Sequence, residues 1–99
     1  GGYNYRLSLV GNPREITQTL GAVGGVKSIT PTNERDGEAN VYIVEVEKNI
    51  DVRKSIFTAC ASRGFAIYGL EPEDSDLESV FIKLIDRGDV KEASGSKKR

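Results

Sequence analysis

Two segments of this 99-residue chain alternate between apolar and polar residues, and each is followed by a segment with apolar residues at helical spacing. The alternating segments are residues 3–10 and 41–47, and a period of two is typical of a strand with one buried face. Their apolar faces consist of Tyr5, Leu7 and Leu9 in the first segment and Tyr42, Val44 and Val46 in the second. This repeated strand-then-helix pattern restricts the chain to folds in which helices pack on a sheet.

The residues after the first strand carry the signals of a helix start. Asn12 suits the cap position, Pro13 the first helical position, and Glu15 lies where a side chain can reach back to the cap. Apolar residues then recur at helical spacing as far as Gly24 and Gly25, which permit the positive φ at which helices end. We therefore expect the first helix to begin at Asn12 and to end at the glycine pair.

The middle of the chain is predicted to form a strand, a turn and the second alternating strand. Residues 26–30 are a short strand candidate. Residues 31–38 are polar and contain the Asp36-Gly37 pair, which is typical of a turn between strands. We expect the third strand to follow directly after this turn.

A second helix and a fourth strand are predicted next. Asn49 and Asp51 are candidate caps for the helix, and Gly64 is its natural stop. Residues 65–70 are the fourth strand, which Pro72 is expected to close. The inward stripe of the second helix consists of Val52, Ile56, Ala59 and Cys60.

A third helix is predicted from the capping box Ser75-Asp76-Leu77-Glu78 to about Arg87. The apolar residues at spacings i, i+3, i+4 and i+7 are Leu77, Val80, Phe81 and Leu84. Residues 89–99 have little to bury and are expected to be a disordered tail. We interpret residues 3–88 as one domain and Gly1-Gly2 as a linker or a remnant of excision, because the chain also lacks methionine.

The predicted order β-α-β-β-α-β belongs to the α+β class. Split βαβ units of this kind close a four-stranded antiparallel sheet with two helices on one face, the ferredoxin-like arrangement, here with an extra C-terminal helix. The other face of the sheet carries Val41 and Ile43, which are also apolar. Either the third helix folds across that face or a partner covers it.

The composition argues against several functional classes. Histidine is absent and there is one cysteine, so the chain cannot build a Cys-His or Ser-His pair or a four-ligand zinc site. Cys60 falls on the inward stripe of the second helix and is interpreted as a small core residue. The chain has 14 basic and 15 acidic residues, and its Lys and Arg are scattered except at Lys97-Lys98-Arg99, so we do not expect nucleic acid as its main partner. We expect no catalytic, cofactor-binding or metal-binding residues in this chain.

The segment 77–84, Leu-Glu-Ser-Val-Phe-Ile-Lys-Leu, resembles the closing L-E-x-V-F-x-x-L helix of an accessory domain in many ABC-2-type exporter ATP-binding subunits. That domain follows the ATPase core. Residues 5–9 look like its first strand, Gly25-Val26 like its helix-to-strand step and residues 63–65 like its second helix stop. The likeness covers about residues 3–86, although the linker 71–75 is more acidic and slightly longer than the family pattern.

The resemblance implies a regulatory or architectural role without catalysis in this chain. ATP and Mg²⁺ would bind to a preceding domain, and the partners would be that ATPase domain, a second copy of this domain and, indirectly, the membrane permease. The location would be the cytoplasm, at the inner face of the cell membrane. The interaction surface would include Leu77, Val80, Phe81 and Leu84, with Val41 and Ile43 on the sheet. Alternatively, the stripe on the third helix packs on the domain's own sheet.

Two other readings remain open at this point. An ACT-like domain, which senses a small molecule such as an amino acid, shares the β-α-β-β-α-β order and often binds its ligand near the first strand-to-helix turn, here Gly11-Asn12-Pro13. A melting-temperature shift with amino acids would favour that reading, because ligand binding stabilises the folded state. A standalone enzyme is the third alternative, but the carboxylates have no second polar group at a recognisable spacing to orient them.

Overall fold

The computed structural model describes residues 3–73 of the chain. Its elements in chain order are β1 (Tyr3–Val10), α1 (Pro13–Gly21), β2 (Val26–Asp36), β3 (Ala39–Val46), α2 (Arg53–Arg63) and β4 (Ala66–Glu73). The predicted helix over residues 77–87, the tail over 89–99 and the domain end at residue 88 lie outside the described residues.

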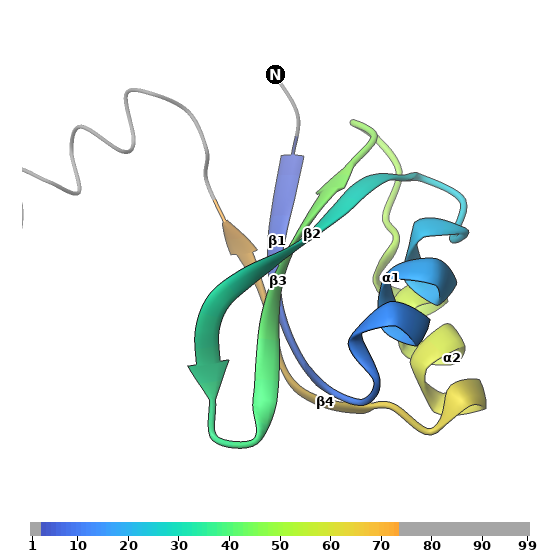
Figure 1. Cartoon of the computed structure of the whole chain (residues 1–99). Coiled ribbons are helices and arrows are strands. Elements are labelled where there is room, and N and C mark those ends of the chain that lie inside the picture. The colour runs from blue at the N-terminus through green and yellow to red at the C-terminus, as the bar shows by residue number, and fades with distance from the viewer. Residues whose placement is uncertain (1–2, 74–99) are drawn as a thin grey trace, which may run out of the picture.

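The four strands form one antiparallel sheet in the order β2-β3-β1-β4. β1 is central and pairs with β3 on one side and β4 on the other, so β2 and β4 are the edge strands. Both helices lie on the same side of the sheet (Figure 1). The predicted α+β class, antiparallel sheet and two covering helices are therefore confirmed.

The core lies between the sheet and the two helices. The predicted inner faces of β1 and β3 are buried, as are Val52, Ile56 and Cys60 of the second helix segment. Leu7, Leu9, Ile16, Leu20 and Ile56 are completely buried, and each such side chain contributes about 1.5–3 kcal/mol to folding. Burial raises the pKa of the Cys60 thiol, which keeps it protonated and fits its predicted role as a core residue.

The start of α1 agrees with its sequence signals, but its end does not. Asn12 Oδ1 accepts a hydrogen bond from the Glu15 backbone nitrogen at 3.1 Å, and Pro13 opens the helix. The helix ends at Gly21 rather than at the predicted glycine pair. The chain tightens there into three-residue turns, in which the Val23 amide donates to the Leu20 carbonyl at 3.1 Å.

The predicted polar turn over residues 31–38 was wrong, because most of it is strand. β2 continues to Asp36, and only Gly37 and Glu38 form the turn into β3. The pairing register shifts between Pro31 and Arg35, where the Thr32 hydroxyl donates to the Val41 carbonyl at 2.8 Å. A proline and an irregular register are tolerated here because β2 is an edge strand.

The same reason explains why β4 is longer than predicted. Pro72 does not close the strand, which continues to Glu73 on the outer edge of the sheet. At the other end, Phe65 lies before β4 and is 8% exposed, and its backbone amide donates to the Cys60 carbonyl at 2.9 Å. Gly64, at φ 77°, ends α2 as predicted.

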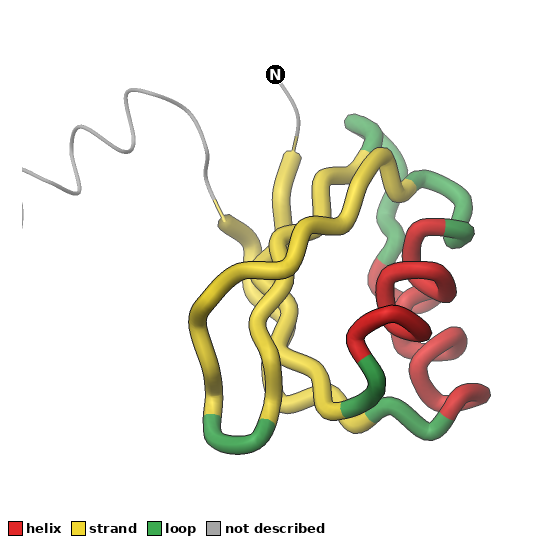
Figure 2. The backbone as a smooth tube through the Cα atoms, viewed as in Figure 1, coloured by secondary structure: helices red, strands yellow, loops and turns green. Residues whose placement is uncertain are grey.

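The sheet face opposite the helices carries the β2–β3 hairpin. The Tyr68 hydroxyl of β4 donates to Glu38 Oε2 at 2.6 Å, and Arg6 of β1 forms an ion pair with Glu34. Glu38 is at the tip of the β2–β3 hairpin and Tyr68 is on β4, with β1 lying between β3 and β4. The hydrogen bond between Tyr68 and Glu38 therefore requires the hairpin tip to bend over this face. Figure 2 shows the hairpin curving away from the helices.

Tyr42 introduces one uncompensated polar atom into the core. Its side chain is fully buried, and its hydroxyl has no hydrogen-bond partner within residues 3–73. A buried hydroxyl without a partner costs about 1–3 kcal/mol relative to water. We expect Tyr42→Phe to leave the free energy of unfolding unchanged or to raise it by about 1 kcal/mol, measured by urea unfolding. A loss of stability would mean that the hydroxyl is hydrogen-bonded after all, with the Asn40 side chain as the candidate partner.

Candidate functional site

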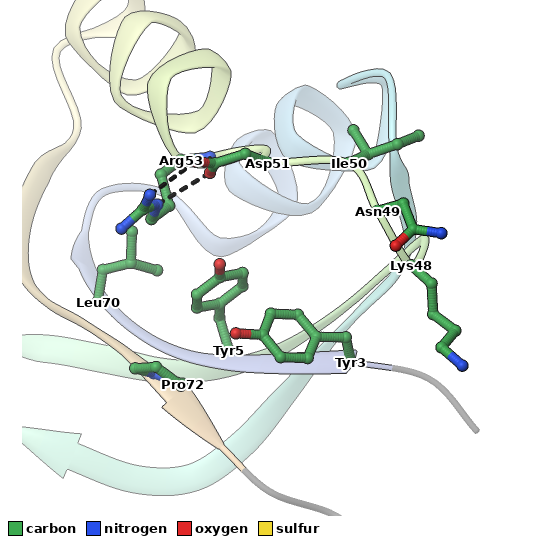
Figure 3. Close-up of a pocket in the computed structure, with 9 residues that line it drawn as sticks. All are labelled: Tyr3, Tyr5, Lys48, Asn49, Ile50, Asp51, Arg53, Leu70 and Pro72. Atoms are coloured by element: carbon green, nitrogen blue, oxygen red, sulfur yellow. Dashed lines mark hydrogen bonds and ion pairs between the residues drawn. The ribbon is translucent and has the colours of Figure 1, made fainter.

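A cavity of about 570 Å³ lies at the end of the sheet where β1 begins and β4 ends (Figure 3). Its walls come from three segments that are far apart in the sequence: the start of β1, the loop between β3 and α2 with the first turn of α2, and the end of β4. The lining residues are Tyr3, Tyr5, Lys48, Asn49, Ile50, Asp51, Arg53, Leu70 and Pro72.

The floor of this cavity is aromatic. The rings of Tyr3 and Tyr5 meet edge to face, with centroids 5.5 Å apart and planes at 87°. Tyr5 belongs to the core, whereas Tyr3 is 49% exposed. Burial is the main cause that raises the pKa of Tyr5, so its hydroxyl stays protonated at neutral pH. The cavity thus offers an apolar surface with two phenolic groups at its edge.

One wall of the cavity is an ion pair at the start of α2. Arg53 donates from Nε to Asp51 Oδ1 at 2.8 Å and from Nη2 to Asp51 Oδ2 at 2.6 Å (Figure 3). The Arg53 backbone amide also donates to Asp51 Oδ1 at 3.1 Å. The cap position of α2 is Val52, not either of the two predicted candidates. Asp51 lies one residue earlier and still accepts from a backbone amide of the first turn, whereas Asn49 lies in the preceding loop at φ 68°.

The arginine strongly favours the charged form of Asp51. Side-chain hydrogen bonds from Arg53 are the main cause that lowers the pKa of Asp51 from 3.8 to about 2. We expect the Asp51 carboxyl resonance to titrate near pH 2 in an NMR experiment, and Arg53→Gln to move the midpoint upward. Since the folded-state pKa is depressed, the pair's contribution to stability is present above pH 3.8 and is lost as the pH falls toward 2. An unchanged midpoint in Arg53→Gln would contradict this origin of the shift.

The outer rim of the cavity is the loop over residues 47–52. Ile50 is 48% exposed, although it packs against Gly25 on its inner side. The Glu47 amide donates to the Gly25 carbonyl at 2.8 Å and anchors the loop to the start of β2. The exposed Phe57 of α2 lines an adjoining hollow that shares Asp51 and Arg53 with the cavity. The cavity and this hollow therefore adjoin across the Asp51–Arg53 ion pair.

Of the site residues expected from the sequence, only those on the sheet fall within the described residues. Val41 is 1% exposed and Ile43 is half-buried, so the sheet face opposite the helices offers a partner little of Val41. A small hollow there, of about 210 Å³, has a mainly polar lining that includes Arg6, Asp36 and Glu71. Leu77, Val80, Phe81 and Leu84 lie outside the described residues, and the structure does not place them.

Gly11, in the turn after β1 where an ACT-like domain would bind a ligand, packs closely against two core side chains. A Cβ added at Gly11 would lie 2.7 Å from Phe65 Cδ1 and 3.2 Å from Ile16 Cδ1. The backbone therefore approaches these two side chains as closely as only glycine permits. Gly11, Asn12 and Pro13 are nevertheless exposed, so the ACT-like reading of this turn stays a prediction.

Residues 3–73 hold no cluster of three or more His, Cys, Asp or Glu side chains that could bind a metal ion. In the same part of the chain, neither helix is long and apolar enough to cross a membrane. No protein-family model and no curated protein matches the chain.

Proposed function

We propose that this chain is a non-catalytic accessory domain of the ATP-binding subunit of an ABC-type exporter, which regulates or assembles the ATPase subunits. The observation that carries the proposal is the combination of topology and motif. Two helices cover one face of a sheet ordered β2-β3-β1-β4, and the L-E-x-V-F-x-x-L sequence follows the last strand within a few residues. We assign this order to the ferredoxin-like arrangement, which is the fold expected of that accessory domain.

In this proposal the domain acts through contact rather than chemistry. The first turns of α2 present Phe57, about half exposed, in a hollow that Arg53 and Lys54 also line. Aromatic side chains and arginine are enriched at protein interfaces, where a few of them carry most of the binding energy. The partners are the preceding ATPase domain or a second copy of this domain, with the permease reached indirectly at the inner face of the membrane.

The proposal is tested by the coding sequence upstream of Gly1 and by the ATPase activity of the encoded protein. We expect the upstream frame to encode a strand followed by G-x-x-x-x-G-K-[ST] and an ABC signature loop. We also expect residues 3–99 alone to be inactive, and deletion of this segment from the parent to change its ATPase rate or its subunit assembly. An upstream frame that encodes no nucleotide-binding domain would overturn the proposal.

A single substitution on α2 gives a finer test. Phe57 is 47% exposed, so Phe57→Ser should leave stability within about 0.5 kcal/mol while it removes a large apolar contact. We expect this variant to change the ATPase rate or the assembly of the parent protein. Ala61→Ser, also exposed on α2 but not a lining residue of the cavity or the adjoining hollow, is the matched control. Equal behaviour of the two variants in the parent would argue against this surface.

A further inference from the structure

The cavity has apolar side chains from β1 and β4 and mostly polar or charged side chains from the loop and α2. Tyr3 is 49% exposed and Ile50 48%, and both lie at its edge, while Leu70 and Pro72 line it from β4 (Figure 3). Exposed apolar residues are ordinary when single, but a group of them around a hollow indicates a contact area.

The chain itself leads to the cavity. Pro72 is a lining residue, and β4 ends one residue later at Glu73, which pairs with Asn4 beside Tyr3. Three residues separate Glu73 from Leu77. At 3.8 Å per Cα step, Leu77 lies within about 15 Å of the end of β4. Anything that follows β4 in sequence is therefore held close to the cavity at a high local concentration.

The sequence that follows β4 has matching apolar residues. Leu77, Val80, Phe81 and Leu84 fall at spacings that place them on one side of a helix. An amphipathic segment of this pattern lays its apolar side in a hydrophobic groove. The chain thus supplies an apolar stripe within reach of an apolar hollow.

The charges on the two sides are complementary. Asp74, Asp76 and Glu78 surround the beginning of the stripe in sequence. Lys48 lines the cavity and Lys54 the adjoining hollow, and both hollows also contain Asp51 and Arg53, whose charges pair with each other. Opposite charges placed in this way favour one orientation of the segment and disfavour others.

From these observations we infer that the segment 77–84 of the same chain docks with Leu77, Val80, Phe81 and Leu84 against the cavity formed by β1, the 47–52 loop and β4. The opposite face of the sheet fits this segment poorly. The hollow there is mainly polar, and the Arg6–Glu34 pair and the Tyr68–Glu38 hydrogen bond cross it. The inference concerns a contact within one chain and does not depend on the proposed function.

The absence of tryptophan from the chain allows a direct test. In the full chain, Phe81→Trp provides a single tryptophan whose emission and acrylamide quenching report its exposure. We expect emission at short wavelength and several-fold weaker quenching than for free tryptophan. Adding Ile50→Asp, or independently Tyr3→Ser, should shift the emission to longer wavelength and restore strong quenching. Tyr68→Ser, on the opposite face, is the matched control and should leave the tryptophan protected. Circular dichroism verifies that each variant is folded.

Four outcomes would overturn the inference. The first is a tryptophan that is already exposed in the Phe81→Trp chain. The second is protection that neither Ile50→Asp nor Tyr3→Ser removes, and the third is protection that only Tyr68→Ser removes, which would place the segment on the opposite face. The fourth is protection that disappears on dilution, which would assign the contact to a second copy of the chain. None of these outcomes depends on whether an ATPase domain precedes the chain, so this test and that of the proposed function fail separately.

Discussion

Leu7→Ala is expected to cost about 2–5 kcal/mol of unfolding free energy, which is a large part of the stability of a domain of this size. Leu7 is fully buried in the central strand β1, where it pairs with Tyr42 of β3 and Leu70 of β4. Truncation removes its contacts with both neighbouring strands and leaves a cavity that the flanking strands cannot close. Urea unfolding followed by circular dichroism measures the change.

The matched control for Leu7→Ala is Gln18→Ala on α1. Gln18 is exposed, so its replacement by alanine should change the free energy of unfolding by less than about 0.5 kcal/mol. A loss at Leu7 no larger than the change at Gln18 would contradict the position of β1 at the centre of the sheet.

Gly25→Ala is expected to destabilise the domain by about 2–4 kcal/mol, because two effects add at this position. The backbone φ is 96°, which a residue with a Cβ adopts only with strain. In addition, the new Cβ would lie 2.8 Å from Ile50 Cγ2 and 2.8 Å from Val52 Cγ1. Thermal or urea unfolding of the variant measures the sum.

The adjacent glycine is a close control. A Cβ added at Gly24 meets no atom within 4 Å, and Gly24 is not among the residues with positive φ. Gly24→Ala should therefore be nearly neutral. If Gly25→Ala were as mild as Gly24→Ala, the contact between the start of β2 and the 47–52 loop would be looser than described. Because Ile50 forms the rim of the cavity, Gly25→Ala should also disturb the fluorescence of the Phe81→Trp reporter.

The elements that the sequence predicted best are those with one buried face. The inner residues of β1 and β3 alternate, and those of α2 recur at helical spacing, because each packs against the same core. Gly64 made the end of α2 predictable, because glycine readily adopts the positive φ at which helices end, and its φ in the structure is 77°. Local chemistry and burial point to the same boundaries in these segments.

The edge strands could not be predicted to their full length. Residues 31–36 of β2 are mostly exposed and polar, so they carry no alternation that a buried face would impose. A proline ends a strand that lies in the middle of a sheet, because it cannot donate a hydrogen bond there. Pro31 and Pro72 are accommodated because they lie in edge strands. Which strand is an edge depends on the order β2-β3-β1-β4, and that order is a property of the whole sheet.

The candidate site escaped the sequence analysis because its walls come from separate segments. The sequence indicates Asn49 and Asp51 only as candidate helix caps and Tyr3 only as the start of a strand. One signal was available: Ile50 and Phe57 are large apolar residues that fall outside the buried stripe of α2. Their exposure marks the surface that the fold places beside Tyr3.

The two prolines have a further consequence for how copies of this domain behave when they are crowded together. Within residues 3–73, each edge strand of the sheet contains one residue without a backbone N–H: Pro31 in β2 and Pro72 in β4. A continuous row of unpaired amides is what allows one sheet to extend into another, and a missing donor interrupts that row. Edge-to-edge polymerisation is thereby discouraged on both sides. Copies brought together in a larger assembly are left to meet through their side-chain surfaces.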